Sequence, residues 1–258
     1  MEKKPLVSIV TPSYNQKKYL EQTILSVLNQ DYPTLEYFVM DGGSTDGSLE
    51  IIKKYQQKLT GWVSEQDQGQ TDAINKGFAR SQGEIMAWIN SDDVYLPGAV
   101  NEAVSFLQEN PHIGMVYGDT NLIDDRDQKI GLFNARQTNY HRLMRGGVYI
   151  PQPAAFWRRE LWNKSGPLDP SFYFAMDYDL WVRFSKSSPI KYHPKLWASF
   201  RIHGEGKTTL SDDRCWPEMR KVHQREGGSV FSLFMAKYIL RMMLGPIWNW
   251  IKMKRFRL

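Results

Sequence analysis

The stretch Glu84–Pro97, EIMAWINSDDVYLP, decides the fold. Apolar residues run from Ile85 to Ile89 and end abruptly in Asn90-Ser91-Asp92-Asp93. Two adjacent carboxylates at the end of a buried strand repel each other and lose hydration unless they face solvent or meet a positive charge. The stretch therefore has two interpretations, an exposed acidic turn or a cation site.

Short apolar runs alternate, in the first part of the chain, with segments whose apolar residues recur every three or four positions. This alternation indicates a parallel sheet with helices on both faces. We therefore predict an α/β fold with a central, mostly parallel sheet. The expected strands are 6–10, 35–40, 61–66 and 84–90, and the expected helices are 19–30, 48–57 and 71–81.

After Pro97 the pattern becomes less regular. We find no internal repeat and no convincing linker before about Ser211, so we expect one unit over 1–210, with halves 1–97 and 98–210, and an extension over 211–258. The elements expected in the second half are helices at 99–110, about 159–164 and 173–188, a strand and turn at 114–124, and a last strand starting at 197.

Three polar turns follow the predicted strands of the first half, at 11–15, 41–46 and 90–93. Each alone is compatible with an ordinary turn that caps the next helix. Ligands of open parallel sheets bind beyond the carboxyl ends of the strands, however, and this arrangement makes the three turns neighbours. Together they predict a ligand site at one edge of the sheet.

The composition is that of a globular protein, because 41% of the 258 residues are hydrophobic and 24% are charged. The single cysteine, Cys215, excludes an internal disulfide framework and fits a reducing compartment. The start, MEKKPLVSIV, is predicted to be a first strand and not a signal peptide. No apolar run reaches the roughly 18 residues that a membrane span needs.

The net charge of +5 is concentrated in the C-terminal segment. Nucleic-acid-binding proteins more often spread basic residues over a whole face, so we expect no nucleic-acid partner. An interfacial helix on an anionic membrane surface is one interpretation, and a helix packed on the domain or on a second copy in a homodimer is the other. Residues 229–258 contain no Asp or Glu, and their basic residues are Lys237, Arg241, Lys252, Lys254, Arg255 and Arg257, with Gly245-Pro246 expected to break the helix.

Four ordered motifs are more specific than any of these features alone. They are VSIVTPSYNQ, VMDGGSTDGS, DQGQTDAINKGFARSQGEIMAWINSDDVYLPGA and FAMDYDLWVRF. Their order and spacing resemble the family 2 inverting glycosyltransferases, which have the GT-A fold, over about 5–209. The resemblance implies a Rossmann-like nucleotide-sugar-binding half over 1–97 and an acceptor-binding half over 98–210.

The same resemblance implies a reaction and a setting. A sugar would move from a nucleotide-sugar donor, a UDP-sugar, to a hydroxyl of a lipid-linked glycan or a growing cell-surface polysaccharide, with inversion at the anomeric carbon. The enzyme would be cytoplasmic and peripheral on the inner face of the cell membrane.

Donor-binding residues follow from the motifs by similarity. Two positions depart from the family pattern: Gly42 replaces the second acid of the nucleoside-reading turn, and Ile74 replaces a phosphate-binding Arg. These departures leave the identity of the base open. The residues expected to border the nucleotide are Thr11, Pro12, Tyr14, Asn15, Asp41, Asp72 and Asn75.

The NSDD stretch resembles the DXD-type metal motif of the family. By similarity Asp92 would face the ribose, and Asp93 would bind Mn²⁺ or Mg²⁺ at the diphosphate, where a hard cation stabilises the leaving group. His203 would complete the metal site, and Lys207 would lie at the diphosphate in a Gly-rich closing loop.

Asp177 resembles the catalytic acid of the family's ED motif, whose first position is Met176 here. It would be the general base that deprotonates the acceptor hydroxyl. Asp179 is the alternative base, and both acids are also compatible with a helix start. Gln152 would line the acceptor pocket.

Two other functions fit parts of the pattern. A nucleotidyltransferase also combines an α/β sheet with metal-bound phosphates, but VTPSYNQ is not a basic, glycine-rich phosphate loop. A non-catalytic carbohydrate-binding protein could keep the fold, although the retention of Asp93 and Asp177 argues against it.

Overall fold

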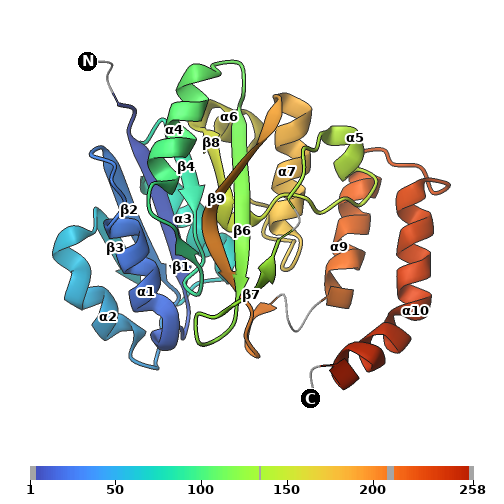
Figure 1. Cartoon of the computed structure of the whole chain (residues 1–258), viewed down its shortest axis with the longest axis horizontal. Helices are drawn as coiled ribbons and strands as arrows, with labels where there is room; N and C mark the ends of the chain where they lie inside the picture. Colours follow the sequence, from blue (N-terminus) through green and yellow to red (C-terminus); the bar gives the residue numbers. More distant parts are fainter. Residues whose placement is uncertain (1–3, 134, 208–211, 256–258) are drawn as a thin grey trace.

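The computed structural model describes residues 4–133, 135–207 and 212–255 (Figure 1). Its first half is a parallel sheet in the order β3-β2-β1-β4. These strands, β1 (Val7–Ser13), β2 (Leu35–Asp41), β3 (Gly61–Ser64) and β4 (Ile85–Trp88), match the four predicted from the sequence. The predicted parallel sheet is therefore present.

The second half continues the same sheet with mixed directions. β8 (Ala155–Arg158) runs antiparallel to both β4 and β6 (Met115–Ile123). β9 (Ile190–Arg201) lies parallel to β6, and the short β5 (Val94–Tyr95) closes the edge antiparallel to β9. β7 (Lys129–Leu132) forms a hairpin with β6, so the α/β prediction holds with one mixed sheet.

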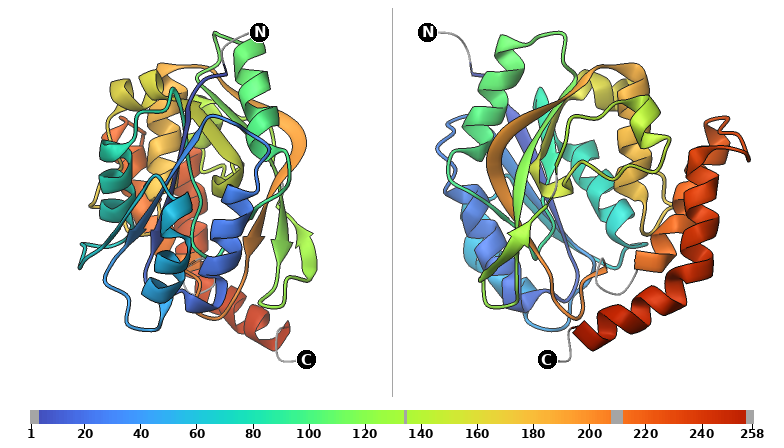
Figure 2. Two further views of the ribbon diagram at one scale, coloured as in Figure 1. Left: turned by 90° about the vertical axis from the view of Figure 1, so that its left-hand side faces the viewer. Right: turned by 45° about the vertical axis from the view of Figure 1, so that its right-hand side comes forward.

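Helices cover both faces of the sheet (Figure 2). α1 (Lys17–Leu28) and α4 (Ala99–Glu109) lie on one face, and α3 (Gln70–Arg80) and α7 (Met176–Ser187) on the other. The remaining short elements are α2 (Ser48–Tyr55), α5 (Tyr140–Leu143), α6 (Arg159–Ser165) and the 3₁₀ turns Gln56–Lys58 and Gln152–Ala154.

α3 lies close against β1 because Gly77 has no side chain. A Cβ at this position would stand 2.5 Å from a methyl carbon of Val10. Such a contact is impossible without moving the helix away from the sheet. Gly77 therefore sets how closely α3, and the turn that precedes it, approach the carboxyl edge of the sheet.

Tryptophans fill the core beneath that edge. The rings of Trp88 and Trp181 stack with centroids 5.6 Å apart, and Trp157 meets Trp88 edge-on at 5.4 Å. All three are buried, so β4, β8 and α7 share one rigid apolar layer. This layer supports the residues that follow β4 and those that begin α7.

The C-terminal segment forms two helices, α9 (Asp212–Arg225) and α10 (Leu233–Arg255). α9 packs on α7, and Phe234 of α10 is fully buried against the rings of His223 and Trp216, at 4.5 and 5.9 Å. The break expected at Gly245-Pro246 is wrong: α10 is one helix, and Figure 2 shows it bending along its length. A proline can kink a helix without ending it.

Within the described ranges, no helix combines the length and apolar character needed to cross a membrane.

Candidate functional site

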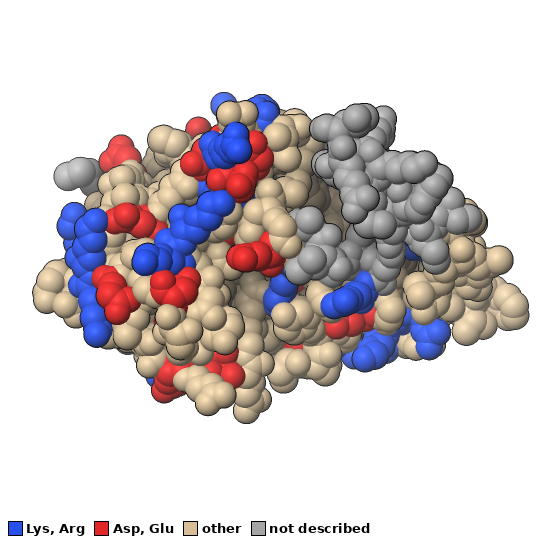
Figure 3. Space-filling model, turned by 90° about the horizontal axis from the view of Figure 1, so that it is seen from below, with Lys and Arg blue, Asp and Glu red and all other residues tan. Residues whose placement is uncertain are grey.

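A cavity of about 720 Å³ opens at the carboxyl edge of the parallel strands. These strands end at the lower side of the molecule in Figure 1, and Figure 3 shows that side, where the surface is hollowed between acidic and basic side chains. The turns after β1, β2 and β4 all contribute to its wall, as the sequence predicts. Its polar and charged lining residues include Gln16, Gln66, Asp67, Gln70, Asn90, Asp92, Gln152, Asp177, Arg201, Glu205 and Lys207.

The residues expected from the sequence divide into two groups. Six of them line the cavity, and seven are not among its lining residues. The first group is Pro12, Tyr14, Asp92, Gln152, Asp177 and Lys207; the second is Thr11, Asn15, Asp41, Asp72, Asn75, Asp93 and His203.

Asp41 organises the turn after β2 from within. Its carboxylate accepts hydrogen bonds from the backbone N–H groups of Gly43 and Ser44 and from the Ser64 hydroxyl, at 3.2, 3.0 and 2.7 Å, and it is 2% exposed. Asn15, in a left-handed conformation with φ of 50°, ties this turn to the one after β1 by accepting from the N–H of Thr45 at 2.9 Å. Both residues therefore shape the loops at this edge of the sheet without lining the cavity.

Thr11 is also fully buried, and its hydroxyl lies 2.9 Å from that of Tyr37.

The carboxylate of Asp67 occupies the space in front of Gly42. A Cβ at position 42 would lie 2.8 Å from Asp67 Oδ2, and Asp67 lines the cavity. Asp67 Oδ1 accepts from the N–H of Gly69 at 2.8 Å, which fixes the side chain in this position. The carboxylate of Asp67, from the turn after β3, therefore lies at the position where the family pattern has a second acid and this chain has Gly42.

The start of α3 is held by its own polar residues. Asp72 accepts from the N–H of Gln68 at 3.1 Å and pairs with Lys76 at 3.0 Å. The side-chain amide of Asn75 exchanges hydrogen bonds with the backbone of Leu168, at 2.9 and 3.0 Å. Ile74 is fully buried in the core. These contacts join α3 to the loop that leads into α7.

The acid pair of the NSDD turn divides into a buried and a cavity-facing residue. Asp93 is fully buried and accepts from the N–H of Arg201 at 2.9 Å and from the Asn90 side chain at 3.3 Å. Burial and the neighbouring charge of Asp92 raise the pKa of Asp93 well above its usual value. Asp92, on the cavity wall, is the acid that can meet a ligand.

Arg201, at the end of β9, is the positive charge beside this turn. It is 3% exposed, and its guanidinium donates to the carbonyls of Asp92 and Asp124 at 2.9 and 3.0 Å and pairs with Asp127 at 2.6 Å. A buried arginine with this many acceptors fixes the turn in one conformation. No motif in the sequence pointed to Arg201.

Asp92 and His203 form a hydrogen-bonded pair beside the cavity. Their Oδ2 and Nε2 atoms lie 2.9 Å apart, and the imidazole is almost completely buried. No group of three or more His, Cys, Asp or Glu ligands occurs within the described ranges. A carboxylate and an imidazole could hold a divalent ion only together with oxygen atoms from a bound ligand or water.

A row of hydrogen bonds crosses the cavity floor from Lys207 to Gln152. Lys207 donates to Gln70 at 2.8 Å, Gln70 to Asn90 at 2.7 Å, and Asn90 to Gln152 at 3.1 Å. Gln152 in turn donates to the carbonyl of Trp88 at 2.8 Å. Sequence reasoning missed Gln70 and Asn90 as site residues; only the placement of Asn90 in the NSDD motif pointed there.

Lys207 stands over the ring of Tyr173 at 3.7 Å, on the wall of the cavity. Burial lowers the pKa of its ammonium to about 8. A partly desolvated ammonium at a cavity wall is suited to binding an anionic group such as a phosphate.

Asp177 enters the cavity from the first turn of α7. Its Oδ1 accepts from the N–H of Tyr178 at 2.7 Å, and burial raises the pKa of the carboxyl to about 6. A carboxylate with a pKa near 6 can accept a proton from a bound hydroxyl near neutral pH.

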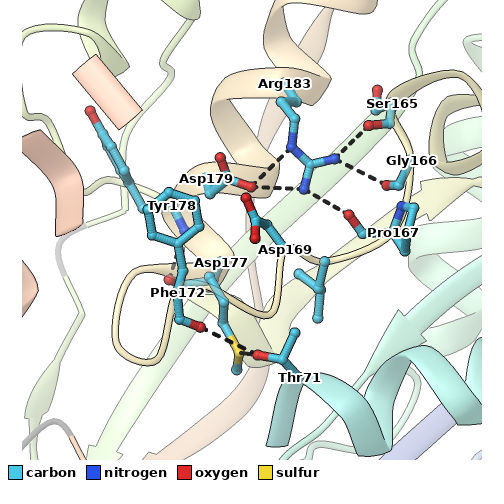
Figure 4. Close-up of polar contacts among 12 residues, drawn as sticks. Thr71, Ser165, Gly166, Pro167, Asp169, Phe172, Asp177, Tyr178, Asp179 and Arg183 are labelled. Carbon is cyan, nitrogen blue, oxygen red and sulfur yellow. Dashed lines mark hydrogen bonds and ion pairs between the residues drawn. The ribbon is translucent and has the colours of Figure 1, made fainter. Parts of the chain in front are cut away.

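Asp179 has a different environment from Asp177, although only two residues separate them. It is fully buried and bonded to Arg183 at 2.8 and 3.0 Å (Figure 4). It also bonds to Arg225 at the end of α9. Arg183 also donates to the carbonyls of Ser165, Gly166 and Pro167. Asp179 therefore lies outside the cavity lining and ties α7 to its neighbours.

Solved structures share this architecture. S. aureus TarS 1-349 in complex with UDP superposes with a TM-score of 0.69 and 18% identity, covering 92% of this chain and 71% of that one. Mannosyltransferase PcManGT from Pyrobaculum calidifontis, in complex with GDP-Man and Mn2+, gives a TM-score of 0.65 and 20% identity, covering 88% of this chain and 65% of that one. At these identities the likeness concerns the fold.

Sequence relatives cover most of the chain. An uncharacterized glycosyltransferase of Haemophilus influenzae is 26% identical over 237 residues, covering 81% of this chain and 69% of that protein. Chondroitin synthase of Escherichia coli is 28% identical over 207 residues, covering 80% of this chain but only 30% of the synthase. The family described as "Glycosyl transferase family 2" matches residues 8–165. The chain therefore belongs to glycosyl transferase family 2 and is a glycosyltransferase with the GT-A fold.

Proposed function

We propose that this glycosyltransferase moves a sugar from a UDP-sugar to an acceptor hydroxyl by a single, inverting displacement. The observation that carries the proposal is one cavity lined by Asp92, Lys207 and Asp177. Lys207, and Asp92 through a divalent ion, suit a nucleotide diphosphate, and Asp177 suits a general base. Residues 1–97 would hold the donor, and 98–210 would bind the acceptor.

Asp177 takes the proton of the acceptor hydroxyl. The oxygen attacks the anomeric carbon as the bond from that carbon to the diphosphate oxygen breaks on the opposite face. The new glycosidic bond therefore has inverted configuration, and the nucleoside diphosphate leaves. The burial of Asp179 between two arginines supports Asp177 as the base.

Asp92 and His203 would hold Mn²⁺ or Mg²⁺, which supplies positive charge to the departing diphosphate when bound. Lys207 adds a second positive charge at the same wall. This assignment gives the metal to Asp92, where the sequence had suggested Asp93. Asp92 lines the cavity and contacts His203, whereas Asp93 accepts hydrogen bonds from Arg201 and Asn90. Asp93 and Arg201 would hold the turn in shape.

Asp67 would contact the base. Its carboxylate fills the space in front of Gly42, so the nucleoside-facing wall keeps an acid despite the glycine. A carboxylate accepts hydrogen bonds only and therefore selects a base edge that presents an N–H. The N3–H of uracil is such a group, and the UDP-bound structure of TarS is consistent with a UDP-sugar donor.

The acceptor would be a lipid-linked glycan or a growing polysaccharide, met at the inner face of the cell membrane. The support is α10, which exposes an apolar face beside basic residues. Leu233, Ile239, Leu240 and Met243 are between 52% and 72% exposed. With no acidic residue over 229–258, this helix suits the surface of an anionic bilayer.

The test of the reaction is turnover of nucleotide sugars by the purified protein. With a panel of UDP-, GDP- and ADP-sugars and Mn²⁺, we expect release of UDP. Asp177→Asn should bind UDP with unchanged affinity by calorimetry but lose at least about a hundredfold in turnover, because general-base catalysis contributes this much or more. Asp31→Asn, an exposed carboxylate on another loop, is the matched control.

Unchanged turnover in Asp177→Asn would assign the base elsewhere. Turnover that survives EDTA would remove the metal from the proposal. Incorporation of the nucleotide into product, with release of pyrophosphate, would indicate a nucleotidyltransferase, and sugar binding without any turnover would indicate a non-catalytic binding protein.

A further inference from the structure

A glutamate of the C-terminal segment reaches back to the cavity wall. Glu218 of α9 accepts hydrogen bonds from three consecutive backbone N–H groups, those of Tyr173, Phe174 and Ala175, at 3.1, 2.7 and 2.7 Å. Three amide donors on one carboxylate form a strong, charge-assisted set. The segment that receives it is the short loop directly before α7.

This loop is part of the site. Tyr173 and Phe174 line the cavity, Ala175 caps α7, and Asp177 follows two residues later. The carbonyl of Tyr173 also accepts from Lys207 at 3.3 Å. The position of Asp177 relative to a bound acceptor is therefore set by the conformation of 173–175.

The contacts that Thr71 of α3 makes with the residues flanking this loop are weaker than the contact of Glu218 with the loop itself. Thr71 meets the carbonyl of Phe172 at 3.4 Å and the sulfur of Met176 at 3.1 Å (Figure 4). Sulfur is a weak acceptor, and 3.4 Å is long for a hydroxyl donor. The carboxylate of Glu218 is thus the strongest hydrogen-bonding partner of these backbone groups in the described chain.

We propose that Glu218 is a positioning residue for the transfer reaction, which holds the loop 173–175 so that Asp177 points at the acceptor hydroxyl. The proposal rests on the proposed function of Asp177. It makes α9, which lies beyond the residues that the family description matches, part of the catalytic unit.

The charge of Glu218 also acts on the base. Two charged groups face Asp177 from neighbouring elements: Lys207, after β9, lowers the pKa of its carboxyl, and Glu218, on α9, raises it. Removal of the Glu218 charge therefore lowers the pKa of Asp177. The pH profile of kcat therefore reports on the charge of Glu218 through the base itself, separately from any change in fold stability.

The experiment compares Glu218→Gln and Glu218→Ala with the wild-type protein. Gln keeps the length and one acceptor oxygen but removes the charge, and Ala removes the contact. The probe is the UDP-sugar that the wild-type protein turns over fastest, with UDP release as the readout. The matched control is Glu160→Gln, an exposed carboxylate on α6, which also packs on α7.

We expect kcat to fall about a hundredfold in Glu218→Ala, because misplacement of a catalytic group by about 1 Å has an effect of this size. The Kd of UDP should change less than about threefold. In Glu218→Gln, the acid limb of the kcat profile should move to lower pH. Hydrogen exchange at 173–175 should accelerate in both Glu218 variants, while their circular dichroism spectra stay like that of wild type. The control Glu160→Gln should match wild type in kcat, in the pH profile and in hydrogen exchange.

Wild-type kcat and an unmoved acid limb in both variants would overturn the inference. So would unchanged hydrogen exchange at 173–175, which is measured without any substrate. A wild-type protein that turns over no nucleotide sugar would instead overturn the proposed function, and this outcome is distinct because it precedes any comparison of variants.

Discussion

At the scale of single residues, the site depends on neighbouring acids that have opposite environments. Asp92 faces the cavity and Asp93 is buried behind it; Asp177 faces the cavity and Asp179 is buried between arginines. In each pair the direction of the side chain, and not its chemistry, decides its role. Buried carboxylates fix backbone and helices, whereas cavity-facing ones can meet a ligand.

The ionisation of Asp177 predicts how activity depends on pH. Its pKa is raised to about 6, so the base is protonated at lower pH. We expect kcat to fall about tenfold per pH unit below 6, and a profile that stays flat to pH 4.5 would contradict this.

The same shift has a consequence for stability, with a definite sign. The unfolded carboxyl ionises near 3.8 and the folded one near 6, so the free energy of unfolding falls as pH rises through this window. Asp177→Asn should therefore have a free energy of unfolding higher than that of wild type at pH 8, by at most about 3 kcal/mol, but not at pH 3.5. Thermal unfolding at the two pH values measures both parts of this prediction.

The sequence could identify the acids but not their directions. Asp92 and Asp93 have the same chemistry and adjacent positions, and only the hydrogen bonds of Asp93 to Arg201 and Asn90 tell them apart. The replacement of the acid at Gly42 by Asp67 is likewise a contact between two turns that are distant in sequence. Neither could be inferred from local pattern.

At the scale of elements, α7 is held by ion pairs and not by packing alone. Asp179 bonds Arg183, one turn along the same helix, and Arg225 at the end of α9. Arg183 also holds the carbonyls of 165–167 at the end of α6. The buried carboxylate of Asp179 therefore links α7 to α9 directly and to the end of α6 through Arg183.

Removal of this carboxylate should destabilise the protein strongly. In Asp179→Asn two arginines lose their charged partner, and breaking a buried pair costs about 3–5 kcal/mol. For a chain of this size we expect the midpoint of thermal unfolding to fall by roughly 10 °C. Asp169→Asn is the control, since Asp169 meets Arg225 at 3.7 Å but is 38% exposed; equal losses in both variants would contradict the prediction.

The parallel strands and their helices could be predicted because each carries its own periodicity. The second half carries less local signal. β5 has two residues, and β9 begins at Ile190, seven residues before the predicted start, because the polar, proline-containing stretch 191–195 is not typical of a strand. Pairing with β6 forms that part of the strand, and such a partner is invisible in local sequence.

At the scale of the whole molecule, α10 gives the protein one apolar, basic side. Its exposed residues recur at Leu233, Leu240 and Met243 along one face of the helix. Lys237, on the same helix, donates to the carbonyl of Arg145 at 3.0 Å and ties it to the catalytic domain. A membrane bound by this face would thus be fixed relative to the cavity.

We expect the protein to sediment with vesicles that contain anionic phospholipid and much less with neutral phosphatidylcholine. Leu240→Gln combined with Met243→Gln should weaken this binding at least about tenfold, since each side chain would lose its apolar burial. The matched control is Ile130→Gln with Leu132→Gln on β7, which are 54% and 53% exposed. Absence of vesicle binding, with a dimer in light scattering, would assign the face to a second copy.

The attachment of α9 and α10 also decides where two members of this family can be recombined. Phe234 is buried against His223 and Trp216, and Glu218 holds the loop before α7. A chimera joined at residue 211 would keep the contacts of Phe234 within the transplanted segment but would exchange the partner of the loop 173–175, and so disturb the base. A graft placed after Phe234 would keep the contacts of both Phe234 and Glu218, and so could redirect the enzyme to another surface while keeping its chemistry.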